Sequence, residues 1–215
     1  MRKISWAFTF VAVVITLAMS IVSLRRPDWL IAKTHEVLHT KITVYYGLMK
    51  RCELDEIKLP GPSNGNLSYA KYECRKFPAS VSDGCDKENR NFCAAWTTAG
   101  YAAELSAGFG ALTILAIFFG VSTHSRRRRV WRAVAGLISL QAIFQVMAFA
   151  IVTHAYQDSW YPTFDYARPG LGYVLSVLTW VIGLLTAFGV VTMGVSAEKG
   201  HRWAAGNRAY RRIDG

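Results

Sequence analysis

The chain has 215 residues, 52% of them hydrophobic, and its 25 Lys and Arg against 14 Asp and Glu give a net charge of +11. The apolar residues gather in four nearly uncharged runs, at about 4–24, 101–122, 130–152 and 171–195. Each run is close to the roughly 20 residues that a bilayer-spanning helix needs. This distribution excludes a soluble globular enzyme, leaves little room for a separate catalytic domain, and predicts one four-span membrane domain.

The first run could be either a membrane anchor or a signal peptide, because it follows the cations Arg2 and Lys3. A signal peptide has an apolar core of about 7 to 15 residues. This run is longer and continues into Arg25-Arg26, which favours a retained helix. A signal peptide cleaved near Ala18-Met19-Ser20 is the alternative.

Cations mark one side of the predicted membrane. They precede the first run, fill the link between the second and third, and follow the fourth, where only Glu198 and Asp214 oppose them. The positive-inside rule predicts that both termini, the loop 123–129 and the tail 196–215 are cytoplasmic. The loops 25–100 and 153–170 then lie outside. The densest basic run could also attract anionic lipid of the inner leaflet, at about 1 kcal/mol per cation. It consists of Arg126, Arg127, Arg128 and Arg129.

All four cysteines fall in the long predicted external loop. They are Cys52, Cys74, Cys85 and Cys93. An even number on the oxidising side of a membrane predicts two disulfides, and sequence alone leaves three pairings open. A zinc site is the competing interpretation, but the spacing matches no zinc clamp and no histidine lies among the cysteines. Asn66 begins an Asn-Leu-Ser sequon, which predicts an external glycosylation site.

The same loop contains two candidate strands. Residues Lys41–Met49 alternate β-branched and aromatic with polar side chains, and Ser68–Arg75 follows a turn-rich segment, Pro60–Ser68. Because a two-stranded hairpin is marginally stable in water, disulfides and the ends of the spans are expected to support a small antiparallel sheet.

These features resemble the claudin and peripheral myelin protein superfamily, whose external loop carries W…G-L-W-x-x-C…C. Here Trp29 follows the first run, and Gly47-Leu48-Met49-Lys50-Arg51-Cys52 precedes a second cysteine. The resemblance implies an all-α bundle of four transmembrane helices capped by a disulfide-stapled extracellular antiparallel β-sheet. It also implies that Trp29 packs at the membrane face of the sheet, that Gly47 and Leu48 end a strand, and that Cys52 pairs with Cys74.

Three departures qualify the resemblance. Met49 replaces the second tryptophan of the motif, the gap between Cys52 and Cys74 is longer than in junctional claudins, and Cys85 and Cys93 are additional. The extra cysteines are more similar to divergent fungal claudin-like tetraspans of the plasma membrane. We therefore expect the membrane-surface anchor of the motif to be either lost or supplied by a neighbouring residue.

Glu104, Gln141 and Gln145 are polar residues within the predicted spans that are candidates for a role. Glu104 is expected to lie at the outer interface, protonated or paired with a cation such as Arg168, although an acid at membrane depth is also a functional candidate. Gln141 and Gln145 lie one helical turn apart and are expected to hydrogen-bond within the bundle, with partner contact as the alternative.

No catalytic motif, metal-binding cluster or cofactor fingerprint is present in the sequence. We therefore expect a non-enzymatic accessory or organising subunit that binds a larger membrane protein, such as a channel or a cell-surface synthase, and modulates its assembly, trafficking or activity. A self-associating adhesion, barrier or scaffold protein is the alternative, while an enzyme or transporter using Glu104 is disfavoured. No nucleic-acid partner and no cofactor are expected, and the plasma membrane is the expected location, with an internal membrane possible.

Overall fold

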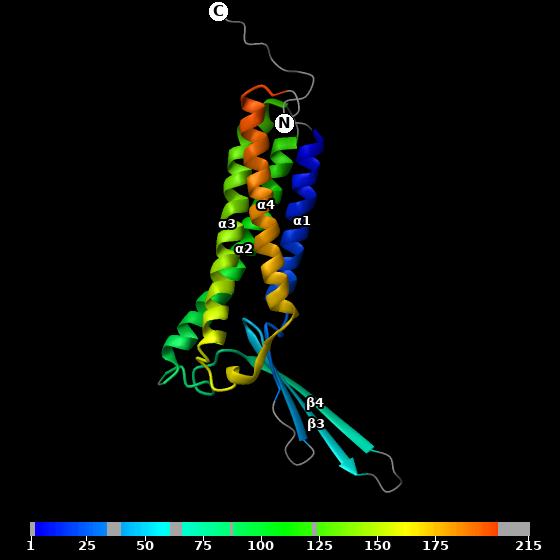
Figure 1. The fold of residues 1–215 in the computed structure, drawn as a ribbon, viewed down its shortest axis with the longest axis vertical. Helices are drawn as coiled ribbons and strands as arrows, with labels where there is room; N and C mark the ends of the chain where they lie inside the picture. Colours follow the sequence, from blue (N-terminus) through cyan, green and yellow to red (C-terminus); the bar gives the residue numbers. More distant parts are fainter. Residues whose placement is uncertain (1–2, 34–39, 61–65, 87, 122–123, 202–215) are drawn as a thin grey trace, which may run out of the picture. The chain divides into compact units, whose positions relative to one another are not determined.

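The computed structural model describes residues 3–33, 40–60, 66–86, 88–121 and 124–201. Their helices are α1 (Lys3–Arg25), α2 (Arg90–Val121), α3 (His124–Gln157) and α4 (Leu171–Glu198). A short 3-10 helix, Phe164–Tyr166, lies between α3 and α4 in the sequence. All four long helices are long and apolar enough to cross a membrane (Figure 1). The expected multi-pass architecture is thus confirmed.

The helices extend beyond the predicted spans. α2 begins at Arg90, before the second apolar run, and α3 ends at Gln157, after the third. The predicted cytoplasmic loop 123–129 requires correction, because α3 begins at His124 and Arg126–Arg129 belong to its first turns. Arginine favours helix and this segment contains neither Pro nor Gly, so nothing in it interrupts the backbone hydrogen bonds.

Five antiparallel strands form one sheet in the order β4-β3-β2-β1-β5. They are β1 (Leu30–Lys33), β2 (Thr40–Tyr46), β3 (Lys50–Pro60), β4 (Asn66–Lys76) and β5 (Ala167–Pro169). The two predicted strands correspond to β2 and β4. Four apolar helices with this disulfide-linked sheet fit the claudin-like fold.

The chain forms two compact units, each built from segments that are distant in sequence. The helix unit comprises Met1–Ser20, Leu105–Val146 and Leu178–Gly215. The sheet unit comprises Ile21–Glu104 and Met147–Val177, and therefore contains every strand.

All four helices contribute to the core of the helix unit. Trp6 of α1, Ile117 of α2, Trp131 of α3 and Val190 of α4 are buried in one apolar cluster. The Trp6 indole also donates a hydrogen bond to the Ile117 carbonyl, at 3.3 Å. The cluster buries the tryptophans and leaves other apolar side chains on the outer surface, which suits helices surrounded by lipid.

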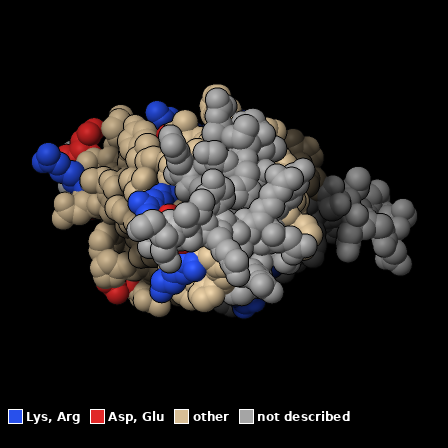
Figure 2. Space-filling model, turned by 90° about the horizontal axis from the view of Figure 1, so that it is seen from above, with Lys and Arg blue, Asp and Glu red and all other residues tan. Residues whose placement is uncertain are grey.

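Charged residues meet where α3 begins and α4 ends. Arg132 of α3 forms an ion pair with Glu198 of α4 at 3.1 Å, and the Trp131 indole donates to the same carboxylate at 3.2 Å. Figure 2 views this end of the helices and shows a Lys or Arg side chain beside an acidic one. The pair links the two helices at the edge of the apolar core.

Candidate interaction surface and its supporting core

Trp29 joins β1 to helical residues within the sheet unit. Its side chain is fully buried, and its indole donates to the Ser23 carbonyl at 2.8 Å. The ring packs edge-to-face on Tyr173, with centroids 6.4 Å apart. Trp29 is therefore buried against helical residues, and its expected place at the membrane face of the sheet stays a prediction.

Gly47 and Leu48 follow the last residue of β2, as the resemblance implied. A side chain at Gly47 would place its Cβ 2.7 Å from the Arg26 carbonyl oxygen and 2.8 Å from the Pro27 Cα. Two backbone segments approach so closely here that only glycine fits. Leu48 is buried.

Trp96 of α2 contacts the chain next to Met49, the residue that replaces the second tryptophan of the motif. The Met49 side chain is 39% exposed, whereas Trp96 is fully buried. The Trp96 indole donates to the Gly47 carbonyl at 3.2 Å. A tryptophan from a distant part of the sequence thus contacts the residue after β2, while the loss or replacement of the membrane-surface anchor stays a prediction.

The four cysteines form two disulfides, Cys52–Cys74 and Cys85–Cys93. Cys52 and Cys74 are directly opposite each other on β3 and β4. The pairing implied by the resemblance is confirmed, and the zinc interpretation is wrong because all four thiols are consumed. The second disulfide closes the segment between β4 and α2.

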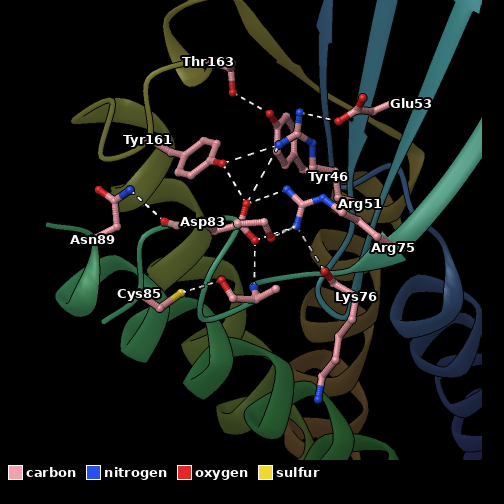
Figure 3. A network of polar contacts seen from close by, with 12 residues as sticks. Tyr46, Arg51, Glu53, Arg75, Lys76, Asp83, Cys85, Asn89, Tyr161 and Thr163 are labelled. Atoms are coloured by element: carbon pink, nitrogen blue, oxygen red, sulfur yellow. Dashed lines mark hydrogen bonds and ion pairs between the residues drawn. The ribbon is translucent and has the colours of Figure 1, made fainter. Parts of the chain in front are cut away.

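Asp83 is the centre of a buried polar network that the sequence did not predict (Figure 3). Its carboxylate accepts hydrogen bonds from Arg75 at 2.6 and 2.7 Å, from the Ala79 backbone N–H at 2.8 Å and from the Tyr161 hydroxyl at 2.9 Å. The Asp83 side chain is fully buried, and Arg51 lies 4.0 Å from it. The network thereby fastens β4, the segment after it and the segment before β5.

The network shifts the pKa values of Asp83 and Tyr161 in opposite directions. Burial opposes ionisation of Asp83, but the hydrogen bonds from Arg75, Ala79 and Tyr161 outweigh it and hold the Asp83 pKa below its usual value. Burial and the bond to the Asp83 carboxylate raise the pKa of Tyr161 to about 12. At neutral pH the acid is therefore charged and the phenol neutral, as a structural ion-pair network requires.

Six aromatic rings pack beneath this network. Phe92, for example, has ring centroids 5.1 Å from Tyr161, 5.4 Å from Trp96 and 5.7 Å from Phe164. The cluster consists of Tyr46, Phe77, Phe92, Trp96, Tyr161 and Phe164. The aromatic residues of the predicted external loop 153–170 therefore fall into two groups. Tyr161 and Phe164 are buried in this cluster, whereas Tyr166 is 69% exposed.

The exposed feature supported by this core is β4. In the described part of the chain it is the last strand of the sheet, and it pairs only with β3. Tyr69 is 60% and Tyr72 54% exposed, and Lys71 forms an exposed ion pair with Glu73 at 2.8 Å. Because side chains alternate along a strand, Tyr69 and Tyr72 project from opposite faces.

The polar residues of the predicted spans differ in their surroundings. Gln141 and Gln145 of α3 are at most 1% exposed, and contact Thr16 and Ser20 of α1 at 3.3 and 3.5 Å. The Ser106 hydroxyl of α2 donates to the Gln141 carbonyl at 2.9 Å. Both glutamines were also candidates for contact with a partner protein. That interpretation requires correction, because neighbouring helices of the same unit cover both side chains.

Glu104 is exposed near the end of the sheet unit's α2 segment. Among the described residues it forms no ion pair, so the pairing with Arg168, one of the two expected alternatives, is not observed, and the interfacial position stays a prediction. The side chains of Arg126, Arg127, Arg128, Arg129 and Asn66 lie outside the described part of the structure; Asn66 is the first residue of β4.

Comparison with protein-family models and with curated protein sequences finds no match for the chain. Within the described residues, no group of three or more His, Cys, Asp or Glu side chains could hold a metal ion. The geometry on which a function can be argued is therefore the stapled sheet and its edge strand.

Proposed function

We propose that the protein is a non-enzymatic accessory or organising subunit of the membrane, which binds a larger integral membrane protein and modulates its assembly, trafficking or activity. The observation that carries the proposal is β4, an edge strand whose Tyr69, Lys71, Tyr72 and Glu73 side chains are all exposed. An edge strand offers unpaired backbone N–H and C=O groups, to which another chain can add by strand pairing.

The support behind β4 suits a rigid binding element. Cys52–Cys74 ties it to β3, and Arg75 at its end is held by the buried carboxylate of Asp83. A surface that is ordered before binding loses less conformational entropy when a partner docks. The exposed tyrosines add large, semi-rigid contact area of the kind enriched at protein interfaces.

The topology proposal accompanies this function. We propose that the protein lies in the plasma membrane as a claudin-like tetraspan, with cytoplasmic termini and an extracellular sheet. The cations at the ends of the predicted spans support this orientation. Under it, Asn66 is accessible to glycosylation, and Arg126–Arg129 face anionic lipid of the inner leaflet.

The test is a native pull-down in a mild detergent, with bands identified and their stoichiometry measured. We expect one larger membrane protein at a fixed ratio, and at least a fivefold weaker recovery with Tyr69→Ser or Tyr72→Ser. Tyr166→Ser is the matched control, because Tyr166 is exposed to a similar degree but lies away from β4. Equal recovery by all three variants would contradict a role for β4, and failure to recover any partner in several detergents would contradict an accessory subunit.

Self-association is the second candidate, and one observation favours it. Lys71 and Glu73 flank Tyr72, so an antiparallel pair of β4 strands centred on Tyr72 would place Lys71 of each copy opposite Glu73 of the other. Opposite charges facing each other across strands are stabilising. Recovery of differently tagged copies of this chain alone, lost on Lys71→Glu and restored by the added change Glu73→Lys, would establish this function in place of the first.

A further inference from the structure

A cavity of about 360 Å³ lies in the sheet unit, within the size range of ligand sites. Its walls come from the residues after β2, the residues at the end of β4 and one face of α2. Leu48, Met49, Phe77 and Tyr101 supply apolar surface, and Lys76 and Glu104 supply the two charges. The cavity is separate from the exposed residues of β4 on which the proposed function rests. Only Lys76, the last residue of that strand, belongs to β4.

The two charges line the same cavity without pairing. Lys76 and Glu104 form no ion pair with each other, and neither side chain forms one with any other residue in the described ranges. Both are exposed, Lys76 at the end of β4 and Glu104 on α2. A cation and an anion that line one mostly apolar cavity complement a ligand that carries both charges.

The position of Glu104 indicates where such a ligand would come from. Glu104 is the fourth residue of the apolar run 101–122, near the predicted outer end of that run, and it belongs to the helix segment Arg90–Gly120 that is apolar enough to cross a membrane. An ionisable side chain at that level is costly unless a partner compensates its charge. No described protein residue does so, while lipid headgroups are present at high concentration at the ends of membrane-spanning helices.

We propose that this cavity binds a zwitterionic phospholipid of the phosphatidylethanolamine class. Lys76 would contact the lipid phosphate, Glu104 would accept hydrogen bonds from the primary ammonium, and the apolar wall would contact the glycerol and upper acyl region. A choline headgroup has no N–H to donate, so it would bind more weakly. A phosphatidylglycerol headgroup lacks the cation and would leave Glu104 uncompensated.

The experiment is native mass spectrometry of the full chain, after exchange into detergent containing equal amounts of phosphatidylethanolamine, phosphatidylcholine and phosphatidylglycerol. We expect retained lipid to be mainly phosphatidylethanolamine. Glu104→Gln should reduce the preference over phosphatidylcholine about tenfold, the size of one charge-assisted hydrogen bond. Lys76→Gln should weaken retention of all three lipids, because each carries a phosphate.

Two matched controls separate the site from general charge effects. Lys50→Gln removes the cation directly opposite Lys76 in the strand register, and Asp165→Asn removes an exposed acid elsewhere in the sheet unit. Both should leave lipid retention unchanged. Equal retention of the three lipids by the wild type, or an unchanged preference in Glu104→Gln, would overturn the proposal.

A wild-type measurement does not depend on the folding of any variant. Phosphatidylethanolamine with a photoreactive group in the upper acyl chain should label the α2 peptide that contains Tyr101 and Glu104. Competition by free phosphoethanolamine at the same concentration as the intact lipid would overturn a lipid ligand in favour of a soluble zwitterion. Displacement of the lipid by the larger protein recovered in the pull-down would reassign the cavity to the protein interface.

Discussion

The sheet unit and the helix unit are stabilised by different interactions. The sheet unit contains both disulfides, a buried ion pair and a six-ring aromatic cluster. The described core of the helix unit contains apolar side chains and neutral glutamine, serine and threonine contacts. Covalent links and charged networks compensate for a small core in water, whereas helices in lipid associate mainly through packing and weak hydrogen bonds.

Asp83→Asn should have the largest effect on the sheet unit. The variant removes the buried charge that Arg75 and Tyr161 surround, and because the Arg75 side chain is 35% exposed we expect a cost in the lower part of the range for buried ion pairs, about 3 to 4 kcal/mol. The folded-state pKa of Asp83 is depressed, so its contribution is complete above the unfolded value near 3.9 and is lost as pH falls through the folded value. In detergent, the free energy of unfolding of the variant should therefore be lower than that of the wild type at neutral pH. It should also change less as the pH is lowered.

Asp165→Asn is the control for this variant, because Asp165 is exposed in the same unit. Equal acid sensitivity of wild type and Asp83→Asn would contradict the role given to the network.

Removal of the disulfides should have the next largest effect on the stability of the sheet unit. Cys52→Ser with Cys74→Ser opens a loop with a sequence separation of 22, for which the chain-entropy estimate is about 3 kcal/mol. Cys85→Ser with Cys93→Ser, with a separation of 8, should cost slightly less, about 2.5 kcal/mol. Proteolysis should then cut the strands of the first variant before the helices. Simultaneous loss of helical content at the same temperature would contradict the division into two units.

Gly47→Ala tests close backbone packing in the sheet unit. The new Cβ would meet backbone atoms of Arg26 and Pro27, which cannot move aside as a side chain could, so we expect a loss of about 2 kcal/mol. Gly108→Ala in α2 is the matched control, since nothing lies within 4 Å of its added Cβ. This control should gain up to about 1 kcal/mol from helix propensity. Similar thermal shifts for both would contradict the assigned contacts.

Sequence patterning predicted the parts that local periodicity encodes. The four apolar runs locate the helices, and the alternation in β2 and β4 locates two strands. β3 was missed because Lys50, Glu53, Asp55 and Glu56 give it a polar composition, although pairing on both sides fixes it as a strand. β1 and β5 are short, and β5 contains a proline, so tertiary pairing decides them.

The candidate site was less accessible from sequence. Four cysteines in one predicted loop indicated the staples, but Asp83, Arg75 and Tyr161 are separated by up to 86 residues, 161 − 75, and form a network only in the folded sheet unit. The one available signal was proximity, because Arg75 adjoins Cys74 and Asp83 lies two residues before Cys85. Such proximity shows which residues are close along the sequence, but it does not show which side chains pair in the folded protein.

Tyr161→Phe should have a smaller, pH-specific effect. At neutral pH it removes one hydrogen bond to Asp83, a loss of about 1 kcal/mol. The folded pKa of Tyr161, about 12, lies above the ordinary value of 10.0, so its stabilisation is present below pH 10 and is lost as pH rises toward 12. As the pH rises from 10 toward 12, the free energy of unfolding of the wild type should therefore fall more steeply than that of the variant. Burial also raises the pKa of Tyr46, but Tyr46 is present in both proteins, so parallel curves would contradict the shift assigned to Tyr161.

Gln141→Leu should have the smallest effect, because it falls in the helix unit. The change removes the 3.3 Å bond to Thr16, but it also removes the buried Oε1 atom, which has no hydrogen-bond partner. Interhelical hydrogen bonds in membranes contribute on average about 0.6 kcal/mol, and relief of an unsatisfied acceptor acts in the opposite direction. We therefore expect a change of less than about 1 kcal/mol of either sign in reversible SDS unfolding. Ser106→Ala, which removes only the donor to the Gln141 carbonyl, should be destabilising by a similar amount. A loss above 2 kcal/mol for Gln141→Leu would instead mean that polar contacts hold the helix unit together as the Asp83 network holds the sheet unit.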